Sequence, residues 1–286
     1  MNNAIDIRLP GGLWLEGTCY RDASLRPLTG EDESFLLDVG DHLSPAGWTT
    51  ALLSRCLTRL GPLSPVSEDA ARSLTIGDRE ALLLHLRRLT LGNHLECRLI
   101  CPAPGCMEKL DLDLSIDDLL LPPYTNPKDF YAVPISEGGL EYTAKFRLPT
   151  GADQEVAVGS VPTDLKVAEN LILRRCIASI IGDGGKIVEE PPPNLMEQIP
   201  TLMASLDPQA ELVMDSNCPV CGGHFSSLFD TASFFRQELS ERTEYIYREV
   251  HMLAFYYHWS EAEIMGMARK KRLRYLDLIE EALGVG

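Results

Sequence analysis

Two Cys-Pro stretches constrain the fold of this chain more than any other feature. Residues 101–110 read CPAPGCMEKL and residues 218–227 read CPVCGGHFSS. Each stretch begins with Cys-Pro, returns to a second Cys within a few residues, and then enters a segment with strand character. Tetrahedral zinc takes four thiolate or imidazole ligands, and two short Cys loops supply two ligands each. The sequence therefore predicts one structural Zn²⁺ site with the ligands Cys101, Cys106, Cys218 and Cys221.

The residues between these cysteines suit tight ligand loops. Pro102 and Pro219 stiffen the start of each loop, and Gly105 or Gly222 permits a sharp turn. Four thiolates would close the coordination shell and leave no position for water, so the predicted site is structural rather than catalytic.

Two alternatives to this ligand set remain open. The cysteines are too few for a disulfide scaffold in a chain of 286 residues, which predicts a reducing cytoplasmic location where close Cys pairs indicate metal more often than disulfide. The first alternative is that the four cysteines are reduced structural residues without metal. Alternatively, Cys97 or His224 replaces one ligand, because the first loop has a looser spacing than the second.

The charge balance favours a protein partner over nucleic acid. The chain carries 26 basic and 42 acidic residues, a formal net charge of −16, whereas a grip on phosphate backbones needs a basic surface. The one dense basic cluster is RKKRLR at residues 269–274, where a solvated helix face is expected and docking onto an acidic partner is the alternative. We see neither a secretory signal nor an apolar run of membrane-spanning length.

The periodicity predicts an α+β fold, mainly helical, with short β-hairpins and a zinc-ribbon-like module formed by the two separated Cys knuckles. Each knuckle is followed by a strand and then a helix, which is a weak sign of duplication. We predict five segments: 1–70, an N-terminal strand arm and helices; 71–122, a helix plus the first knuckle; 123–193, a hairpin and helical insertion; 194–231, a helix plus the second knuckle; and 232–286, a C-terminal helical segment.

Local signals place individual elements within these segments. Gly11-Gly12 predicts a turn between strands, and Gly138-Gly139 predicts the turn of a hairpin. The expected helices are those starting at Thr29 or Gly30, at Thr49–Leu60, after a cap at Thr75 and up to Gly92, at Asp164–Ile181, at Asn194–Leu206, and over residues 232–259, followed by a helix capped by Ser260 with Glu263.

No catalytic motif accompanies these elements. GDGGK at residues 182–186 lacks the spacing and the Ser or Thr of a phosphate-binding loop, and the sequence holds no His-Glu-x-x-His, GxSxG or GxGxxG pattern. The sequence therefore predicts a protein that is not an enzyme.

Several of these stretches resemble a known family. CPAPGC, CPVCGG, the stretch FRLPTGADQEVA at residues 146–157 and the run IYREVHMLAFYYHWSEAEIMGMARKKRLRYLDLI resemble T4-type baseplate hub and tail assembly proteins of contractile phage-tail-like injection gene clusters. The resemblance covers most of residues 75–283. Ala268 departs from it, since a Pro is expected there.

The resemblance implies a non-enzymatic assembly factor or component of the baseplate hub, with hub or spike proteins as partners and the four cysteines as zinc ligands. Its corner motif is Tyr257, His258, Trp259, Ser260 and Glu263. The expected interaction residues are Tyr257, His258, Trp259, Arg269, Lys270, Lys271 and Arg272. The alternative function is a zinc-ribbon nucleic-acid-binding or transcription-associated protein that uses RKKRLR.

Overall fold

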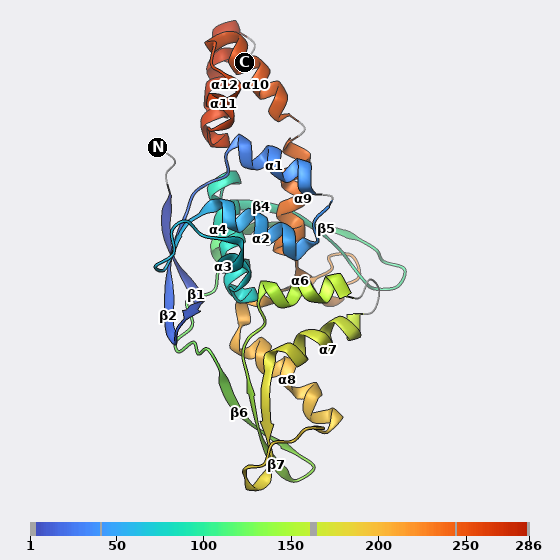
Figure 1. Ribbon diagram of the computed structural model, residues 1–286. Coiled ribbons are helices and arrows are strands. Elements are labelled where there is room, and N and C mark those ends of the chain that lie inside the picture. The colour runs from blue at the N-terminus through green and yellow to red at the C-terminus, as the bar shows by residue number, and fades with distance from the viewer. Residues whose placement is uncertain (1–3, 41, 161–164, 244, 285–286) are drawn as a thin grey trace.

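The computed structural model describes residues 4–40, 42–160, 165–243 and 245–284, and within them it has an α+β fold of helices and antiparallel hairpins (Figure 1). The helices are α1 (Gly30–Gly40), α2 (Pro45–Cys56), α3 (Glu68–Arg72), α4 (Ile76–Leu91), α5 (Ile116–Leu119), α6 (Gly151–Ser160), α7 (Leu165–Cys176), α8 (Pro193–Leu206), α9 (Thr231–Thr243), α10 (Ile246–Tyr257), α11 (Glu261–Met265) and α12 (Arg269–Leu283).

Within the described part of the chain, the strands form four antiparallel sheets in the orders β1-β2-β3, β4-β5, β6-β7-β8 and β10-β9. Their bounds are β1 (Ile5–Leu15), β2 (Thr18–Leu25), β3 (Leu57–Leu60), β4 (His94–Ile100), β5 (Lys109–Ser115), β6 (Tyr131–Glu137), β7 (Leu140–Phe146), β8 (Ile177–Ile181), β9 (Leu212–Asn217) and β10 (His224–Phe229).

The described chain forms a central body flanked by smaller units. In the body, the sheet β1-β2-β3 packs with α1, α2, α4 and α9 around buried side chains such as Trp48, Leu52 and Phe235. A second core around Phe146 joins the sheet β6-β7-β8 to α7 and α8, and a third around Leu253 joins α10, α11 and α12. These two units lie at opposite ends of the body (Figure 1). The five predicted segments remain a prediction.

The caps read from the sequence set several helix ends. The Thr75 side chain accepts a hydrogen bond from the Asp78 N–H at the start of α4, and Gly92 ends that helix with a φ of 100°. Ser260 and Glu263 form the predicted reciprocal capping box before α11. Gly138 and Gly139, both at positive φ, turn the hairpin β6–β7 as predicted.

The turn predicted at Gly11-Gly12 is wrong, because both glycines lie inside β1. The pairing of β1 with β2 is irregular between Arg8 and Leu13, and the N–H groups of Gly11 and Gly12 each donate to a carboxylate oxygen of Asp78 at 2.8 Å. Gly12 has a φ of 102° and packs against the backbone of β2, so the pair makes a bulge that seats the start of α4.

Two predicted helices are in fact a helix followed directly by a strand. The helix α2 begins at Pro45, capped by Ser44, and ends at Cys56, so the chain continues as β3 rather than as helix up to Leu60. Likewise α7 ends at Cys176 and β8 follows at once. Apolar periodicity does not mark these junctions, because both strands are short runs without Gly or Pro before them.

The helix predicted over residues 232–259 is two helices. The helix α9 belongs to the central body, whereas α10 belongs to the C-terminal unit with α11 and α12. Apolar residues at helical spacing run through both, which is why the sequence reads as one element.

The same arrangement of elements occurs twice in the chain. In each copy a β-hairpin leads through an Arg-x-x-Thr-Gly-x-Asp stretch, at residues 26–32 and 147–153, into two helices and a third strand. The Asp32 carboxylate accepts from the N–H and the hydroxyl of Thr29 at 2.9 Å, and Asp153 accepts from the same two groups of Thr150 at 3.0 Å.

The match extends to the arginines around these carboxylates. Arg26 and Arg55 bind Asp32, and Arg147 and Arg175 bind Asp153 in the equivalent way. Each half then continues through helix, hairpin with Cys knuckle, and helix. The predicted duplication is therefore larger than the knuckles that suggested it, and the repeated Arg-x-x-Thr-Gly-x-Asp pattern is the sequence signal for it.

Candidate metal centre

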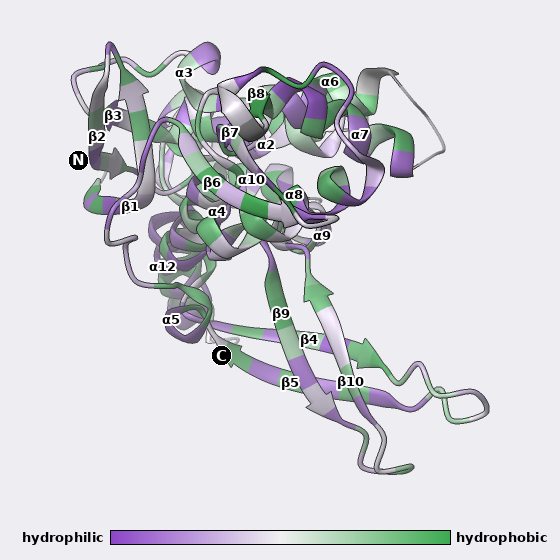
Figure 2. Ribbon diagram, turned by 90° about the horizontal axis from the view of Figure 1, so that it is seen from below, coloured by the Kyte–Doolittle hydropathy of each residue, from purple (hydrophilic) through white to green (hydrophobic). Residues whose placement is uncertain are grey.

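Two hairpins carry the Cys knuckles at their tips. β4 pairs with β5 and β9 pairs with β10 in full register, and both hairpins project from the body in the same direction (Figure 2). Leu95, Ile116 and Phe229 pack at their base, so the hairpins are anchored side by side. The tips consequently meet although the two knuckles are far apart in the sequence.

The four predicted ligands come together at these tips. Their sulfur atoms all lie within 4.8 Å of one another, and Cys101–Cys221 and Cys106–Cys218 have Sγ–Sγ distances of 3.7 Å. A disulfide has an S–S distance of about 2.05 Å. In a tetrahedral site with Zn–S bonds of about 2.3 Å, neighbouring sulfurs lie about 3.8 Å apart. The spacing therefore fits four thiolates around one tetrahedral metal ion.

Backbone hydrogen bonds shape each knuckle around its sulfurs. The Cys101 N–H donates to the Glu108 carbonyl at 2.8 Å, and the Cys218 N–H donates to the Gly223 carbonyl at 2.9 Å. Gly105 and Gly222 take positive φ values of 80° and 70° with open space around them, so the turns need glycine for its backbone conformation.

Backbone amides also point at the sulfurs. A hydrogen bond from the Cys221 N–H is the main reason that the pKa of Cys218 is lowered to about 7. The Ala103 N–H lowers the pKa of Cys101 in the same way, but burial and the neighbouring thiols outweigh it and raise that pKa to about 12. Four thiols this close cannot all ionise by themselves, because each anion disfavours the next; a cation among them removes that conflict.

The two alternative ligands lie outside the cluster. Cys97 points into the apolar core at the base of the hairpins, together with Leu95 and Phe229. His224 is exposed on β10, and its Nε2 lies 3.9 Å from Asp215. Cys101, Cys106, Cys218 and Cys221 are thus the group of His, Cys, Asp and Glu side chains that the described residues bring to metal-binding distance.

The zinc-ribbon-like form of the prediction is wrong. The hairpins β4–β5 and β9–β10 are separate two-stranded sheets, and none of the described backbone pairing joins one to the other. Each strand satisfies its inner hydrogen bonds within its own hairpin, so the contact at the tips is made by side chains around Cys101, Leu110 and Cys218.

The corner residues of the C-terminal unit are half-buried or exposed: Tyr257 and Trp259 are half-buried, whereas His258, Ser260 and Glu263 are exposed. The rings of Tyr257 and Trp259 stack at 4.6 Å, and both meet Tyr275 of α12 edge-on. His258 is exposed and ends α10 in the left-handed conformation with a φ of 55°. Of the expected interaction residues, Tyr257 and Trp259 therefore help to hold α10 against α12.

The basic cluster is divided between the interior and the surface. Arg272 is fully buried and binds Glu33 of α1 and Glu249 of α10, each at 2.8 Å. Arg269 is 12% exposed and lies 3.8 Å and 3.7 Å from the same two carboxylates. Lys270 and Lys271 are exposed. The expected solvated face is correct for the lysines and wrong for Arg272, whose charge is required by two buried acids.

Comparisons with known proteins were made on the whole chain. A family model described as T4 bacteriophage base plate protein matches residues 20–236, which include both knuckles and the stretch at 146–157. No curated protein and no solved structure matches. None of the helices in the described residues has the length and apolar character needed to cross a membrane. Since the match covers most of the sequence, the chain belongs to the T4 bacteriophage base plate protein family.

Proposed function

We propose that this chain is a non-enzymatic assembly factor or structural component of the baseplate hub in a contractile phage-tail-like particle. Membership of the base plate family supports a role in such a particle. The resemblance of the knuckles to hub and tail assembly proteins supports a place in the hub. In this proposal the protein binds hub or spike proteins in the cytoplasm, either as an assembly chaperone or as part of the finished particle.

We further propose that Cys101, Cys106, Cys218 and Cys221 hold a structural Zn²⁺. The observation that carries this is the convergence of four sulfurs within 4.8 Å at the tips of two hairpins that share no backbone pairing. Four thiolates complete a tetrahedral shell, so the ion would clamp the hairpins together rather than bind a reactant. Metal binding of this kind contributes directly to folding stability.

Zinc content and thermal stability test the metal site. We expect about one zinc per chain in the wild type, with loss of the metal and a lower melting temperature in Cys101→Ser and in Cys218→Ser. Cys97→Ala is the matched control, because this thiol lies outside the cluster and its loss should leave the zinc content unchanged. A metal-free wild-type protein with the same stability as the variants contradicts the proposal.

Co-purification tests the assembly role. The tagged chain is expressed with the hub and spike proteins of its own gene cluster, and retention of one of them is the expected result. Particles are then imaged from a deletion strain, where defective baseplates are expected. Normal particles from the deletion strain, without any retained hub or spike protein, would overturn the role.

The placement of the basic cluster weakens the nucleic-acid alternative. Arg272 is buried and Arg269 nearly so, with both charges directed at Glu33 and Glu249. A phosphate-binding surface would have to rely on the exposed Lys270, Lys271 and Arg274 of this cluster against a net charge of −16. Strong DNA binding that weakens steeply with salt would restore this alternative.

A further inference from the structure

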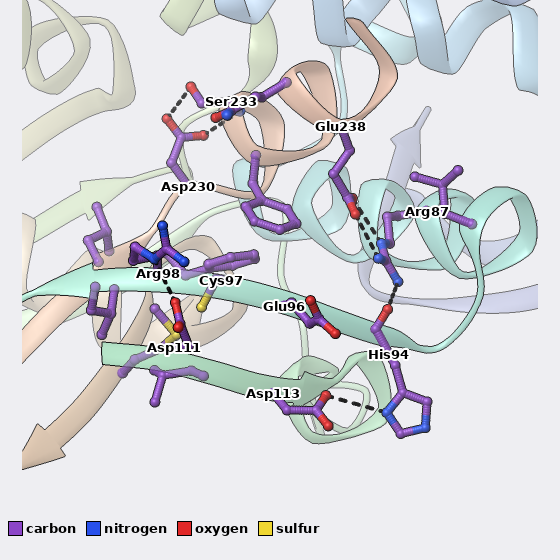
Figure 3. A pocket seen from close by; sticks show the side chains of 18 of the residues that line it. Arg87, His94, Glu96, Cys97, Arg98, Asp111, Asp113, Asp230, Ser233 and Glu238 are labelled. Carbon is purple, nitrogen blue, oxygen red and sulfur yellow. Dashed lines mark hydrogen bonds and ion pairs between the residues drawn. The ribbon is translucent and has the colours of Figure 1, made fainter. Parts of the chain in front are cut away.

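A large groove lies beside the hairpins (Figure 3), and the residues that line it do not include the four cysteines of the cluster. We call it the acidic groove; its walls are the helices α4 and α9 on one side and residues of β4, β5, β9 and β10 on the other. Its volume of about 1180 Å³ exceeds the range of about 300–1,000 Å³ typical of small-molecule pockets.

Negative charge dominates the lining of this groove. The carboxylates that line it are Glu96, Asp111, Asp113, Asp230, Glu238 and Glu241, and they face the two guanidinium groups of Arg87 and Arg98.

Both arginines are already engaged with one carboxylate each. Arg87 binds Glu238 through two hydrogen bonds of 3.0 Å and 2.8 Å, and Arg98 binds Asp111 at 2.6 Å. Among the side chains that the structure describes, Glu96, Asp113, Asp230 and Glu241 have no guanidinium partner in the groove. His94 lies 3.5 Å from Asp113 but is charged only when protonated.

Apolar side chains also line this groove. The rings of Phe229 and Phe234 are 5.3 Å apart, and Leu112 and Met214 pack beside them. Leu228 is 62% exposed among the groove residues. Nucleic acid has the wrong charge for this surface, and a simple cation would leave the apolar residues in water. A ligand that covers both must carry positive charge and apolar side chains.

We propose that the acidic groove docks a basic amphipathic segment of another protein of the particle. Its Lys or Arg side chains pair with Glu96, Asp113 and Glu241, and its apolar side chains cover Phe234 and Leu228. The charges supply orientation and fast association, while the apolar contacts supply most of the affinity. The identity of the partner as a baseplate protein rests on the proposed function; the chemistry of the groove does not.

Peptide binding to the full-length, zinc-loaded protein tests the groove directly. The probe is a fluorescein-labelled 14-residue peptide of Lys and Leu at helical amphipathic spacing, measured by fluorescence anisotropy at low salt. The triple variant Glu96→Gln, Asp113→Asn, Glu241→Gln should raise its Kd at least tenfold. Leu228→Ser, at a largely exposed position, should raise it about threefold.

Matched controls separate the groove from the general negative charge of the chain. The triple variant Glu169→Gln, Glu190→Gln, Asp277→Asn removes three exposed carboxylates elsewhere and should change the Kd less than twofold. A peptide of Lys and Ser should bind at least tenfold more weakly than the probe. An equal loss of affinity in both triple variants would overturn the docking proposal, because binding would then follow net charge alone. Equal binding of the two peptides would overturn it for the same reason.

Co-purification distinguishes failure of the groove from failure of the baseplate role. If the wild type and the triple variant of the groove retain a hub or spike protein equally, the docking proposal is wrong and the baseplate role stands. If the wild type retains none while the probe binds as expected, the groove stands and the baseplate role is wrong.

Discussion

Replacing Arg272 by Met should detach or loosen the C-terminal unit. The guanidinium donates four hydrogen bonds: two to the Glu33 carboxylate at 2.9 Å and 2.8 Å, one to Glu249 at 2.8 Å and one to the Met267 carbonyl at 2.8 Å. Both acids are buried, so the variant leaves two carboxylates without their main partner. Breaking a buried pair in this way costs about 3–5 kcal/mol.

The lower end of that range is expected, because Arg269 lies within 4 Å of both acids and offers partial compensation. A loss of about 3 kcal/mol corresponds to roughly a 150-fold larger open fraction. Hydrogen exchange of the backbone amides in α10 to α12 should speed up by about this factor, and guanidinium denaturation should report the lost free energy of unfolding.

Acid should rescue this variant. Burial raises the pKa of Glu33 even with Arg272 beside it. Without the arginine, the pKa of Glu33 rises further. A buried carboxyl with a raised pKa is tolerated in its protonated form, so stability is lost as pH increases through the pKa of the folded state. The stability gap to wild type should therefore be larger at pH 8 than at pH 5.

Arg274→Met is the matched control on the same helix. Arg274 is 65% exposed and pairs with the exposed Glu281 at 3.6 Å, so its loss should change the free energy of unfolding by less than about 0.5 kcal/mol. Adding Glu33→Gln and Glu249→Gln to Arg272→Met should restore most of the stability. Equal effects of Arg272→Met and Arg274→Met, with no dependence on pH, would refute the reasoning.

Three further predictions concern α4 and α11. Gly77→Ala should cost more than about 2 kcal/mol, because the new Cβ would overlap the buried Asp207 carboxylate that accepts the Gly77 N–H; denaturation measures it. Burial and the neighbouring Arg88 lower the pKa of His85 to about 4, so stability should fall as pH drops from 6.5 towards 4, by about 2 kcal/mol at pH 5. Ser260→Ala should cost about 1 kcal/mol through loss of the capping box, measured by thermal denaturation.

Each of these predictions has its own control. Gly40→Ala places a Cβ no closer than 4.0 Å to a neighbouring group and should be nearly neutral. His85→Gln should flatten the dependence of stability on pH between 6.5 and 4; an unchanged profile would show that His85 is not the titrating group. Ser260→Thr keeps the capping oxygen, and a loss equal to that of Ser260→Ala would count against the cap.

Local chemistry was enough to predict the elements that end in a side-chain cap or a required turn. Thr75 and Gly92 bound α4 because both act on the backbone within one turn of the helix. The cysteine knuckles were predictable for the same reason: their residues and spacing define the loop and its ligands. At Cys56 and Cys176, however, the helix stops because the next residues pair with a strand distant in the sequence.

Charged residues show the limit of sequence reasoning more clearly. The basic run at residues 269–274 predicts a solvent-exposed helix face. Arg272 is buried because Glu33 and Glu249, distant in the sequence, lie next to it in the fold. The acidic groove was missed for a related reason. Glu96, Asp111 and Asp113 alternate along two strands in the manner of any solvated face, and only the docking of α9 turns that face into a wall.

The position of the cysteine cluster has a mechanical consequence. Cys106 and Cys218 are 112 residues apart, and the unit built from β6, β7, β8, α7 and α8 lies between them. A metal ion joining the knuckles would close the chain between Cys106 and Cys218 into a loop that contains this unit. Local unfolding of the intervening unit would then leave the two hairpins joined at their tips, so the rest of the fold would not depend on that unit staying folded.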